Sequence, residues 1–317
     1  MEIIESTTDF SLQKKSAVAI GKFDGIHLGH QKLLSQLLAQ REQGLLATVF
    51  TFAIQPAAFF GGEGKELTTK AEKRAAFEAL GIDVLIEFPL NRETAATAPA
   101  AFVESYLAER MRAAYICAGP DLSFGKDGAG DYALLARYAD RFGYRTELIE
   151  KVRVDGEEVS STRVREAVRL GKMEEAAGML GRFYAASGSV AHGKKLGRTL
   201  GMPTANLVPE EDKLLPPNGV YHTRVRIDGV NSFYSSISNV GYKPTVSDEN
   251  RLGIETYLYD FEGDLYGREI TVEFLSFRRP ERKFSSVEAL RTQIEADIAA
   301  GREFSQGACQ KTAFSIK

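Results

Sequence analysis

Two histidines, His27 and His30, lie three positions apart just after a short apolar run, residues 17–20, that predicts a β-strand. In the first turn of a helix this spacing brings both imidazole rings to one side, and Gly29 leaves the space beside them open to a ligand. Unpaired N–H groups and the positive end of a helix attract phosphate at such a strand–helix junction. We therefore expect the pair to donate hydrogen bonds to the phosphoryl groups of a nucleotide.

Two other interpretations of this pair are weaker. Histidines on a helix are often no more than exposed polar residues, but this chain places two of its four histidines within ten residues that also hold three glycines. A zinc site would need a third and a fourth ligand, which a cysteine or a nearby carboxylate would have to supply. The junction is also where a doubly wound sheet binds its ligands, which favours phosphate binding.

A second group of residues with chemical potential spans residues 188–206. Its first part nearly matches the Gly-x-x-x-x-Gly-Lys-[Ser/Thr] loop that cradles phosphates, but Lys195 replaces the hydroxyl residue and no helical pattern follows, so we reject that interpretation. Thr204 and Asn206 offer hard oxygen ligands of the kind that suits Mg²⁺ bridging phosphates. Three glycines allow the backbone to approach phosphates closely, namely Gly193, Gly197 and Gly201.

One carboxylate, Glu255, lies in a β-rich run, residues 254–261, whose alternation places it on one strand face with Tyr257 and Tyr259. Taken alone, it is best interpreted as an outward-facing strand residue. A carboxylate can also take a proton from a weakly acidic hydroxyl within hydrogen-bond reach. Whether Glu255 has that role depends on the resemblance given below.

The N-terminal part of the chain alternates strand and helix patterns. Between the strands lie helical signals, such as a leucine stripe that Gly44 closes and a capping-box pair, Thr69 and Glu72. Short apolar or β-branched runs predict strands over residues 17–20, 45–52, 82–88, 114–118 and 145–150. Strand and helix in regular succession predict a parallel, doubly wound α/β sheet.

The character of the sequence changes after Gly181, where β-branched and aromatic residues become frequent and turn signals come closer together. Turns at residues 228–229 and 262–264 separate β-rich runs over residues 220–227, 230–240, 254–261 and 269–277. Antiparallel hairpins that close into a small barrel follow from this pattern. A capping-box pair, Ser285 and Glu288, opens a last helix that we expect to stop at Gly301.

Composition excludes several classes of protein. The chain has 317 residues, which favours two domains, and its 40 Lys and Arg against 43 Asp and Glu give a net charge of −3, so no basic field exists to hold nucleic acid. Cys117 and Cys309 have neither metal-type nor redox-type spacing. No leader pattern and no membrane-spanning apolar run occurs. We expect a cytoplasmic protein with neither a membrane nor a nucleic-acid partner.

The segment of residues 21–30, Gly-Lys-Phe-Asp-Gly-Ile-His-Leu-Gly-His, resembles the His-x-Gly-His signature of adenylyl-transferring nucleotidyltransferases. In this form it looks like the bacterial bifunctional riboflavin kinase/FMN adenylyltransferase family, also called FAD synthetase. Five further segments are similar to that family's patterns, in chain order: residues 119–125, 159–165, 196–206, 236–241 and 254–261. The resemblance covers essentially the whole chain.

The resemblance implies an α/β domain followed by a β domain. Residues 1–181 would form a Rossmann-like adenylyltransferase, and residues 182–317 an antiparallel riboflavin kinase barrel with a C-terminal helix. Riboflavin and ATP would give FMN and ADP, and FMN and a second ATP would then give FAD and pyrophosphate. The same resemblance implies Mg²⁺ at both sites.

The matching positions imply the residues of each site. In the adenylyltransferase, His27 and His30 are catalytic, and the residues that bind ATP and phosphate are Gly21, Phe23, Asp24, Gly29, Asp121, Ser161, Thr162, Arg163 and Arg165. In the kinase, Glu255 is the general base, Thr204 and Asn206 hold the metal, and the residues that bind ATP and flavin are Gly193, Gly197, Arg198, Gly201, Pro203 and Asn239.

The physical character of residues 161–165 agrees with this implication. Ser161 and Thr162 are residues that cap a following helix, and Arg163 and Arg165 place two cations where a triphosphate could be gripped. Three further arginines, Arg278, Arg279 and Arg282, are either solvated charges or help to hold phosphates. The sequence leaves that choice open.

Two positions depart from the family's pattern. Gln55 stands where the family commonly has a histidine, and Leu122 replaces a usual aromatic residue. They motivate an alternative, a riboflavin kinase whose adenylyltransferase domain is weakened or inactive. A second alternative is a flavin-binding or regulatory protein without catalysis. For the quaternary structure we expect a monomer or a weak homo-oligomer.

Overall fold

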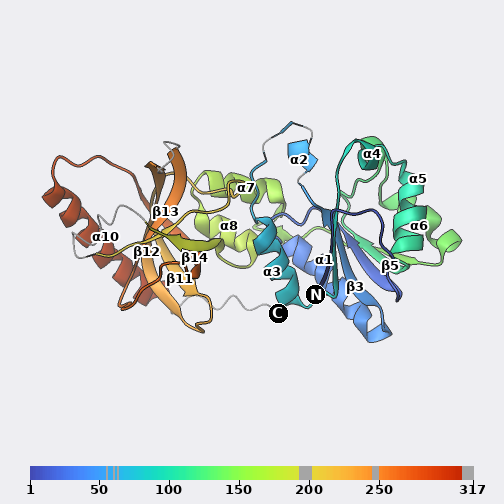
Figure 1. Ribbon diagram of the computed structural model, residues 1–317, viewed down its shortest axis with the longest axis horizontal. Coiled ribbons are helices and arrows are strands. Elements are labelled where there is room, and N and C mark those ends of the chain that lie inside the picture. The colour runs from blue at the N-terminus through green and yellow to red at the C-terminus, as the bar shows by residue number, and fades with distance from the viewer. Residues whose placement is uncertain (55, 60, 63, 193–201, 245–249, 309–317) are drawn as a thin grey trace. The chain divides into compact units, whose positions relative to one another are not determined.

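The computed structural model describes residues 1–317 apart from 55, 60, 63, 193–201, 245–249 and 309–317 (Figure 1). Its contacts divide the chain into two compact units, Met1–Ser161 and Thr162–Lys317. Helix α8 (Met173–Leu180) packs against strands of the second unit, so this division falls before it. The sequence placed the functional boundary after residue 181, and that boundary stays a prediction.

The first unit contains a parallel six-stranded sheet in the order β1-β4-β3-β2-β5-β6 (Figure 1). Its strands are β1 (Glu2–Glu5), β2 (Ser16–Ile20), β3 (Leu46–Phe52), β4 (Val84–Phe88), β5 (Ala113–Ala118) and β6 (Arg145–Leu148). From β2 the chain builds outward to β3 and β4, then returns to β5 on the other side. The strand order therefore reverses between β2 and β5, and the predicted doubly wound sheet is confirmed.

Helices connect these strands. They are α1 (Leu28–Ala39), α2 (Pro56–Phe59), α3 (Lys70–Leu80), α4 (Arg92–Ala95), α5 (Pro99–Phe102) and α6 (Tyr132–Phe142), with a π-helical stretch at Val103–Arg110 and 3₁₀ turns at Gln40–Gln43 and Lys126–Gly128. Thr69 and Glu72 form the predicted capping box of α3, and Gly44, with a φ of 76°, ends the first helical segment. A short hairpin, β7 (Arg153–Val154) and β8 (Glu157–Glu158), precedes α7 (Ser161–Arg169).

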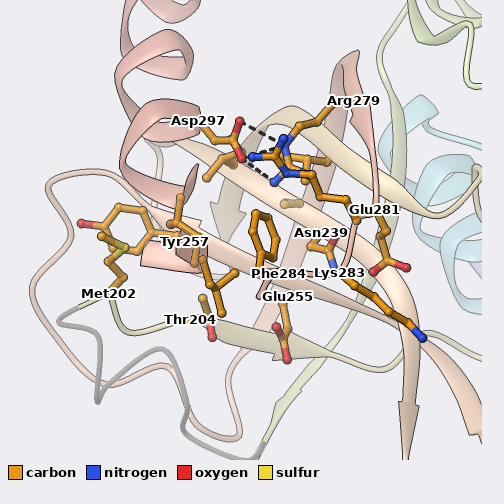
Figure 2. A pocket seen from close by; sticks show the side chains of 16 residues that line it. Met202, Thr204, Asn239, Glu255, Tyr257, Arg279, Glu281, Lys283, Phe284 and Asp297 are labelled. Carbon is orange, nitrogen blue, oxygen red and sulfur yellow. Dashed lines mark hydrogen bonds and ion pairs between the residues drawn. The ribbon is translucent and has the colours of Figure 1, made fainter. Parts of the chain in front are cut away.

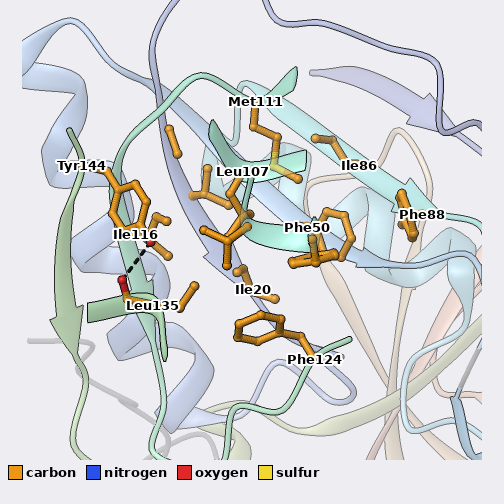
Figure 3. Close-up of a cluster of buried hydrophobic side chains, with 14 of the residues drawn as sticks. Ile20, Phe50, Ile86, Phe88, Leu107, Met111, Ile116, Phe124, Leu135 and Tyr144 are labelled. Carbon is orange, nitrogen blue, oxygen red and sulfur yellow. Dashed lines mark hydrogen bonds between the residues drawn. The ribbon is translucent and has the colours of Figure 1, made fainter. Parts of the chain in front are cut away.

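Alternate residues of β2 pack into two separate hydrophobic clusters. Val18 and Ile20 belong to one cluster, and Ala17 and Ala19 to the other. Because successive side chains of a strand point to opposite faces, both faces of the sheet are covered. Figure 3 shows the first cluster, in which the Phe50 ring lies 5.1 Å from that of Phe88, measured between centroids. Because the sheet is buried on both faces, the ends of its strands are held in place. The loop that carries His27 and His30 begins at one of these ends.

The second unit contains a closed antiparallel barrel in the order β10-β13-β12-β11-β14-β9, as the hairpin signals predicted. Its strands are β9 (Tyr184–Ala191), β10 (Ala205–Leu207), β11 (Gly219–Ile227), β12 (Phe233–Pro244), β13 (Asn250–Leu258) and β14 (Glu269–Pro280). Four buried hydroxyl groups link three strands, with oxygen–oxygen distances of 2.7–2.8 Å from Thr223 to Ser236 and Ser238, and from Ser238 to Thr256. These hydroxyl groups are buried inside the barrel. Asn239 and Glu255 are their neighbours along β12 and β13, so they lie on the outer face of the barrel.

The last helix, α10 (Val287–Ala308), begins close to the predicted start, but its cap is Ser286 rather than Ser285, because the Ser286 hydroxyl accepts from the backbone N–H of Ala289 at 3.1 Å. The predicted stop at Gly301 is wrong, because the helix continues through it. A Cβ atom at Gly301 would overlap the hydroxyl of Tyr259 on the barrel, so the glycine allows close packing here rather than ending the helix. None of the helices that the structure describes is long and apolar enough to cross a membrane.

Candidate active sites

The loop of residues 21–30 leaves the carboxyl end of β2, beside the point where the strand order reverses. His27 is the N-cap residue of α1, and its Nδ1 accepts from the backbone N–H of His30 at 3.4 Å. The two imidazole rings stack, with centroids 3.7 Å apart and planes 16° from parallel. A Cβ atom at Gly29 would lie 3.2 Å from the His27 ring. The predicted pair therefore forms a compact unit at the start of a helix.

The backbone of this loop is held in a tight, unusual conformation. Phe23, Gly25 and Ile26 all have positive φ values, 51°, 82° and 41°. The Asp24 carboxylate is 2% exposed and accepts from the backbone N–H groups of Leu67 and Thr68 at 2.8 and 3.3 Å. Backbone strain of this kind persists only where surrounding contacts hold it. Asp24 thus stabilises the loop through these two hydrogen bonds.

Phe23 is fully buried in this loop and belongs to the second hydrophobic cluster of the sheet. Its ring lies 5.2 Å from that of His30 and 5.6 Å from that of Phe77, measured between centroids. A Cβ atom at Gly21 would lie 3.1 Å from the Phe23 ring. Gly21 and Phe23 therefore place the histidines by packing.

The site residues predicted from the segment of residues 159–165 lie on helix α7. Helix α7 begins at Ser161 itself, so Ser161 and Thr162 occupy its first turn. The Ser161 hydroxyl donates to the backbone carbonyl of Asp24 at 2.8 Å, which ties the helix start to the histidine loop. Arg163 and Arg165 are further residues of the same helix, in the second unit.

Asp121 follows β5, on the other side of the strand reversal from His27. Its Oδ2 forms an ion pair with the Lys151 Nζ at 2.8 Å, and the same ammonium contacts the Glu158 carboxylate at 2.9 Å. These residues line a shallow cavity of about 380 Å³. Leu122, one of the two departures, packs partly buried against the first cluster, and Gln55 lies outside the described residues.

A cavity of about 580 Å³ in the second unit lies between the outer wall of the barrel and α10 (Figure 2). Its apolar lining comes from β11, β12 and α10, including Val220, Ile237, Leu290 and Ile294. Its polar lining includes Thr204, Asn239, Glu255, Arg279, Glu281 and Asp297. Apolar walls with a few convergent polar groups are typical of a small-molecule site.

Strand register brings three predicted residues into one row. Glu255 on β13 pairs with Asn206 on β10 and with Asn239 on β12. Residues directly opposite each other on neighbouring strands share a face, with Cβ atoms roughly 5 Å apart. The three polar side chains, far apart in the sequence, are therefore neighbours on the barrel wall.

Thr204, just before β10, lines this cavity and also a second cavity of about 400 Å³. The second cavity is lined further by Pro203, Tyr257 and the turn after β13. Thr204 and Tyr257 thus separate two adjoining spaces. The remaining predicted residues of the loop, Gly193, Gly197, Arg198 and Gly201, lie outside the described residues.

The three arginines whose role the sequence left open bind side chains of α10. Arg278 donates to the Asp297 carboxylate at 2.8 Å, Arg279 donates to it at 2.6 Å, and Arg282 bonds to Gln293. Burial alone would raise the pKa of Asp297, but the hydrogen bonds from Arg279 and Arg278 hold it below its ordinary value. Solvated charges are therefore the wrong interpretation for Arg278 and Arg279, whose guanidinium groups join the barrel to the helix that closes the cavity.

Sequence reasoning missed two polar lining residues, Glu281 and Asp297, and placed Tyr257 on the face of Glu255 without assigning it to the site. The sequence showed the helical spacing of Leu290 and Ile294, but it did not show that this apolar face lines a cavity against the barrel wall. Among the residues that the structure describes, no cluster of three or more His, Cys, Asp or Glu side chains could hold a metal ion. A cation here would depend on other ligands, such as hydroxyl and amide oxygens and phosphates.

Comparisons with known proteins match both parts of the chain to families. A riboflavin kinase family model matches residues 180–305, and an FAD synthetase model matches residues 9–163. A bifunctional riboflavin kinase/FMN adenylyltransferase from Listeria monocytogenes is 36% identical, covering 94% of this chain and 95% of its own. One from Pseudomonas fluorescens is also 36% identical, covering 95% and 97%. A solved structure of a macrolide-efflux protein from Streptococcus pneumoniae is 31% identical with a TM-score of 0.83, over 95% of this chain and 98% of that one.

Proposed function

The chain belongs to the bifunctional riboflavin kinase/FMN adenylyltransferase family, and we propose how its residues divide the two reactions. The kinase domain converts riboflavin and ATP to FMN and ADP, and the adenylyltransferase domain converts FMN and a second ATP to FAD and pyrophosphate. Riboflavin, FMN and ATP are therefore substrates, and both activities imply a divalent cation. The row of Asn206, Glu255 and Asn239 beside the cavity is the observation that carries the assignment of residues.

Riboflavin occupies the larger cavity, between the barrel wall and α10. Its volume of about 580 Å³ suits a ligand of this size. The flat aromatic ring of the flavin lies against the apolar side chains of Ile237, Phe284, Leu290 and Ile294. This leaves the polyol chain to extend toward Glu255, which lines the same cavity.

ATP occupies the second cavity, on the other side of Thr204 and Tyr257. Thr204 and Asn206 would hold Mg²⁺ through a hydroxyl and an amide oxygen, and a cation there would neutralise the charge of the transferred phosphoryl group. The donor set fits, because Mg²⁺ is commonly bound through few protein atoms together with substrate phosphates. Pro203 lines this cavity, and Gly193, Gly197, Arg198 and Gly201 contribute to it by prediction from the sequence.

Glu255 is the general base of the kinase. The terminal hydroxyl of the polyol is a weak acid, so attack on the γ-phosphate requires that its proton be taken up. The Glu255 carboxylate is half-buried on the wall of the cavity and lies beside Asn206 and Asn239. Its place on a strand of a closed barrel holds it at a fixed distance from both neighbours.

Adenylyl transfer needs no such base. An FMN phosphate, with a second pKa near 6, is already an anion at pH 7, so its attack on the α-phosphate of ATP requires only that repulsion be neutralised. His27 and His30 donate hydrogen bonds to the phosphates, and Gly21, Phe23, Asp24 and Gly29 shape the loop that carries them. Asp121, Ser161, Thr162, Arg163 and Arg165 complete the nucleotide site by prediction from the sequence.

We also propose a cytoplasmic location and a monomer or weak homo-oligomer. The sequence pattern and the net charge of −3 support a location away from membranes and nucleic acid. These statements rest on the sequence.

A time course with riboflavin, ATP and Mg²⁺, followed by chromatographic separation of the flavins, tests the proposal. FMN should appear first and FAD later. FMN alone would favour a kinase with a weakened adenylyltransferase domain. The residues to change would then be Gln55, to the family's histidine, and Leu122, to an aromatic residue. Flavin binding without consumption of ATP would favour the non-catalytic alternative.

A further inference from the structure

Glu281, just beyond β14, lies in none of the sequence segments that predicted the kinase site, yet it lines the flavin cavity (Figure 2). Its Oε1 accepts from the Nδ2 of Asn239 at 2.8 Å, and its Oε2 accepts from the Nδ2 of Asn218 at 3.5 Å. A Cβ atom at Gly241 would overlap Glu281 Oε1, so this glycine makes room for the carboxylate. Three separate segments therefore converge on one exposed acidic group.

The chemistry of the pair fixes the orientation of Asn239. An ionised carboxylate only accepts hydrogen bonds, whereas a carboxamide has one donating and one accepting end. Asn239 must therefore turn its NH₂ group toward Glu281, and its Oδ1 points the other way. Among the described residues, no hydrogen bond uses that oxygen.

The strand register shows what lies near this oxygen. Asn239 stands directly opposite Glu255 on β13, roughly 5 Å away between Cβ atoms. A polyol whose terminal hydroxyl reaches Glu255 has its neighbouring hydroxyls within range of Asn239. Each of those hydroxyls is a donor that requires an acceptor.

We infer that Glu281 is a positioning residue of the kinase, which orients Asn239 so that its Oδ1 accepts a hydrogen bond from a hydroxyl of the polyol chain. This inference rests on the proposed function of the same cavity. Without Glu281 the carboxamide can rotate and present its NH₂ group, which cannot accept from a hydroxyl. Glu281 thereby favours substrates with a hydroxylated chain over those without one.

The test compares Glu281→Ala and Glu281→Gln with the unchanged full chain, using riboflavin and analogues that each lack one hydroxyl of the side chain. Glu281→Ala should raise the KM for riboflavin about tenfold and change kcat less than about threefold, since a ground-state hydrogen bond is lost. Glu281→Gln keeps an accepting oxygen and should show a smaller rise, about threefold. The penalty for one deoxy analogue should shrink in Glu281→Ala.

Controls separate this inference from a structural effect. Glu303→Ala removes the same charge from an exposed position on α10 outside the cavity and should leave the KM unchanged. Conversion of supplied FMN to FAD should be equal in all variants. A normal riboflavin KM in Glu281→Ala, or an undiminished penalty for every deoxy analogue, would overturn the inference. Failure of the unchanged chain to form FMN, or full activity of Glu255→Gln, would instead overturn the proposed function.

Discussion

The histidine loop holds its polar groups in place through an unusual backbone path, whereas the barrel holds its polar groups through strand register. In the loop, three positive φ values and the buried Asp24 carboxylate fix where His27 and His30 lie. On the barrel, Asn206, Glu255 and Asn239 lie on regular ladders whose backbone bonds do not depend on side-chain identity. Each arrangement suits the reaction that we propose for it.

The difference follows from what each reaction demands. Adenylyl transfer starts from a nucleophile that is already charged, so a cradle of hydrogen-bond donors at a helix N-terminus is sufficient. Phosphorylation of an alcohol needs a base at a defined distance from one hydroxyl. A strand of a closed barrel supplies that precision. Substitutions should therefore separate the activities cleanly at the barrel, and in the loop they should disturb the structure more unless the new side chain keeps the cap of α1.

The largest effect should come from Glu255→Gln. The amide keeps the shape of the side chain but cannot take a proton, so we expect kcat for FMN formation to fall about 10²- to 10⁴-fold. FAD formation from supplied FMN should stay within about twofold of the unchanged chain. Steady-state assays of both steps measure this, and an equal loss of both would show that the sites are not independent.

The matching change in the loop is His27→Asn. Asparagine is a good N-cap residue, so helix α1 keeps its cap while the imidazole is lost. FAD formation should fall about 10²-fold or more, as for loss of a hydrogen-bond donor to a developing charge. FMN formation and the melting temperature should hardly change. His27→Ala adds a loss of about 1 kcal/mol in stability, and if both variants had full FAD formation the role of His27 would be refuted.

A smaller effect should follow from Asp297→Asn, which weakens the attachment of α10 to the barrel. The side chain is 4% exposed and accepts from Arg278, Arg279 and Gln293. Loss of its charge should lower the free energy of unfolding by about 2 kcal/mol, since the arginines are partly exposed. Chemical denaturation of both proteins measures this difference.

The same pair has a defined pH dependence. The pKa of Asp297 in the folded protein lies below its ordinary value of 3.8, so its charge stabilises the fold fully above that value. The stabilisation is lost as the pH falls through the lower, folded pKa. The difference in unfolding free energy between the two proteins should thus be constant above about pH 5 and shrink below about pH 4. A difference that is independent of pH would exclude the ion pair as its cause.

The smallest effect concerns two helical glycines. Gly301→Ala places a methyl group against the Tyr259 hydroxyl and should lower stability by about 1 kcal/mol, because the cost of overpacking exceeds the gain in helix propensity. Gly178→Ala, in α8, meets nothing within 4 Å and should raise stability by about 0.5–1 kcal/mol, as helix propensity predicts. Thermal unfolding distinguishes them, and a gain in stability for Gly301→Ala as well would show that packing at Gly301 is unimportant.

The sequence predicted the elements that local pattern specifies. Strands β2 to β6 and the barrel hairpins end within a few residues of the predicted bounds, and the Thr69 capping box is present. It did not predict β1, because Glu2-Ile3-Ile4-Glu5 is short and becomes a strand only by pairing with β4. Gly301 resembled a helix stop because its actual reason, close packing on Tyr259, involves a residue far away in the chain.

The sites show the same difference between features set by local sequence and features set by long-range contacts. Residue type and spacing singled out His27, His30 and Thr204 as candidates, and the family resemblance added Glu255; their roles stay predictions. The pairing of Asp297 with two arginines, and that of Glu281 with Asn239, joins segments that only the folded barrel brings together. Long-range pairing of this kind leaves no local pattern in the sequence.

Mixing two inactive variants tests most directly whether two separate sets of residues carry the two reactions. Glu255→Gln and His27→Asn are incubated with riboflavin, ATP and Mg²⁺, first each alone and then together, and the flavins are separated over time. Neither variant alone should form FAD, because the first makes no FMN and the second cannot adenylylate it. The mixture should form FAD. A mixture that accumulates FMN without FAD, although Glu255→Gln folds normally, would contradict the assignment of one reaction to each site.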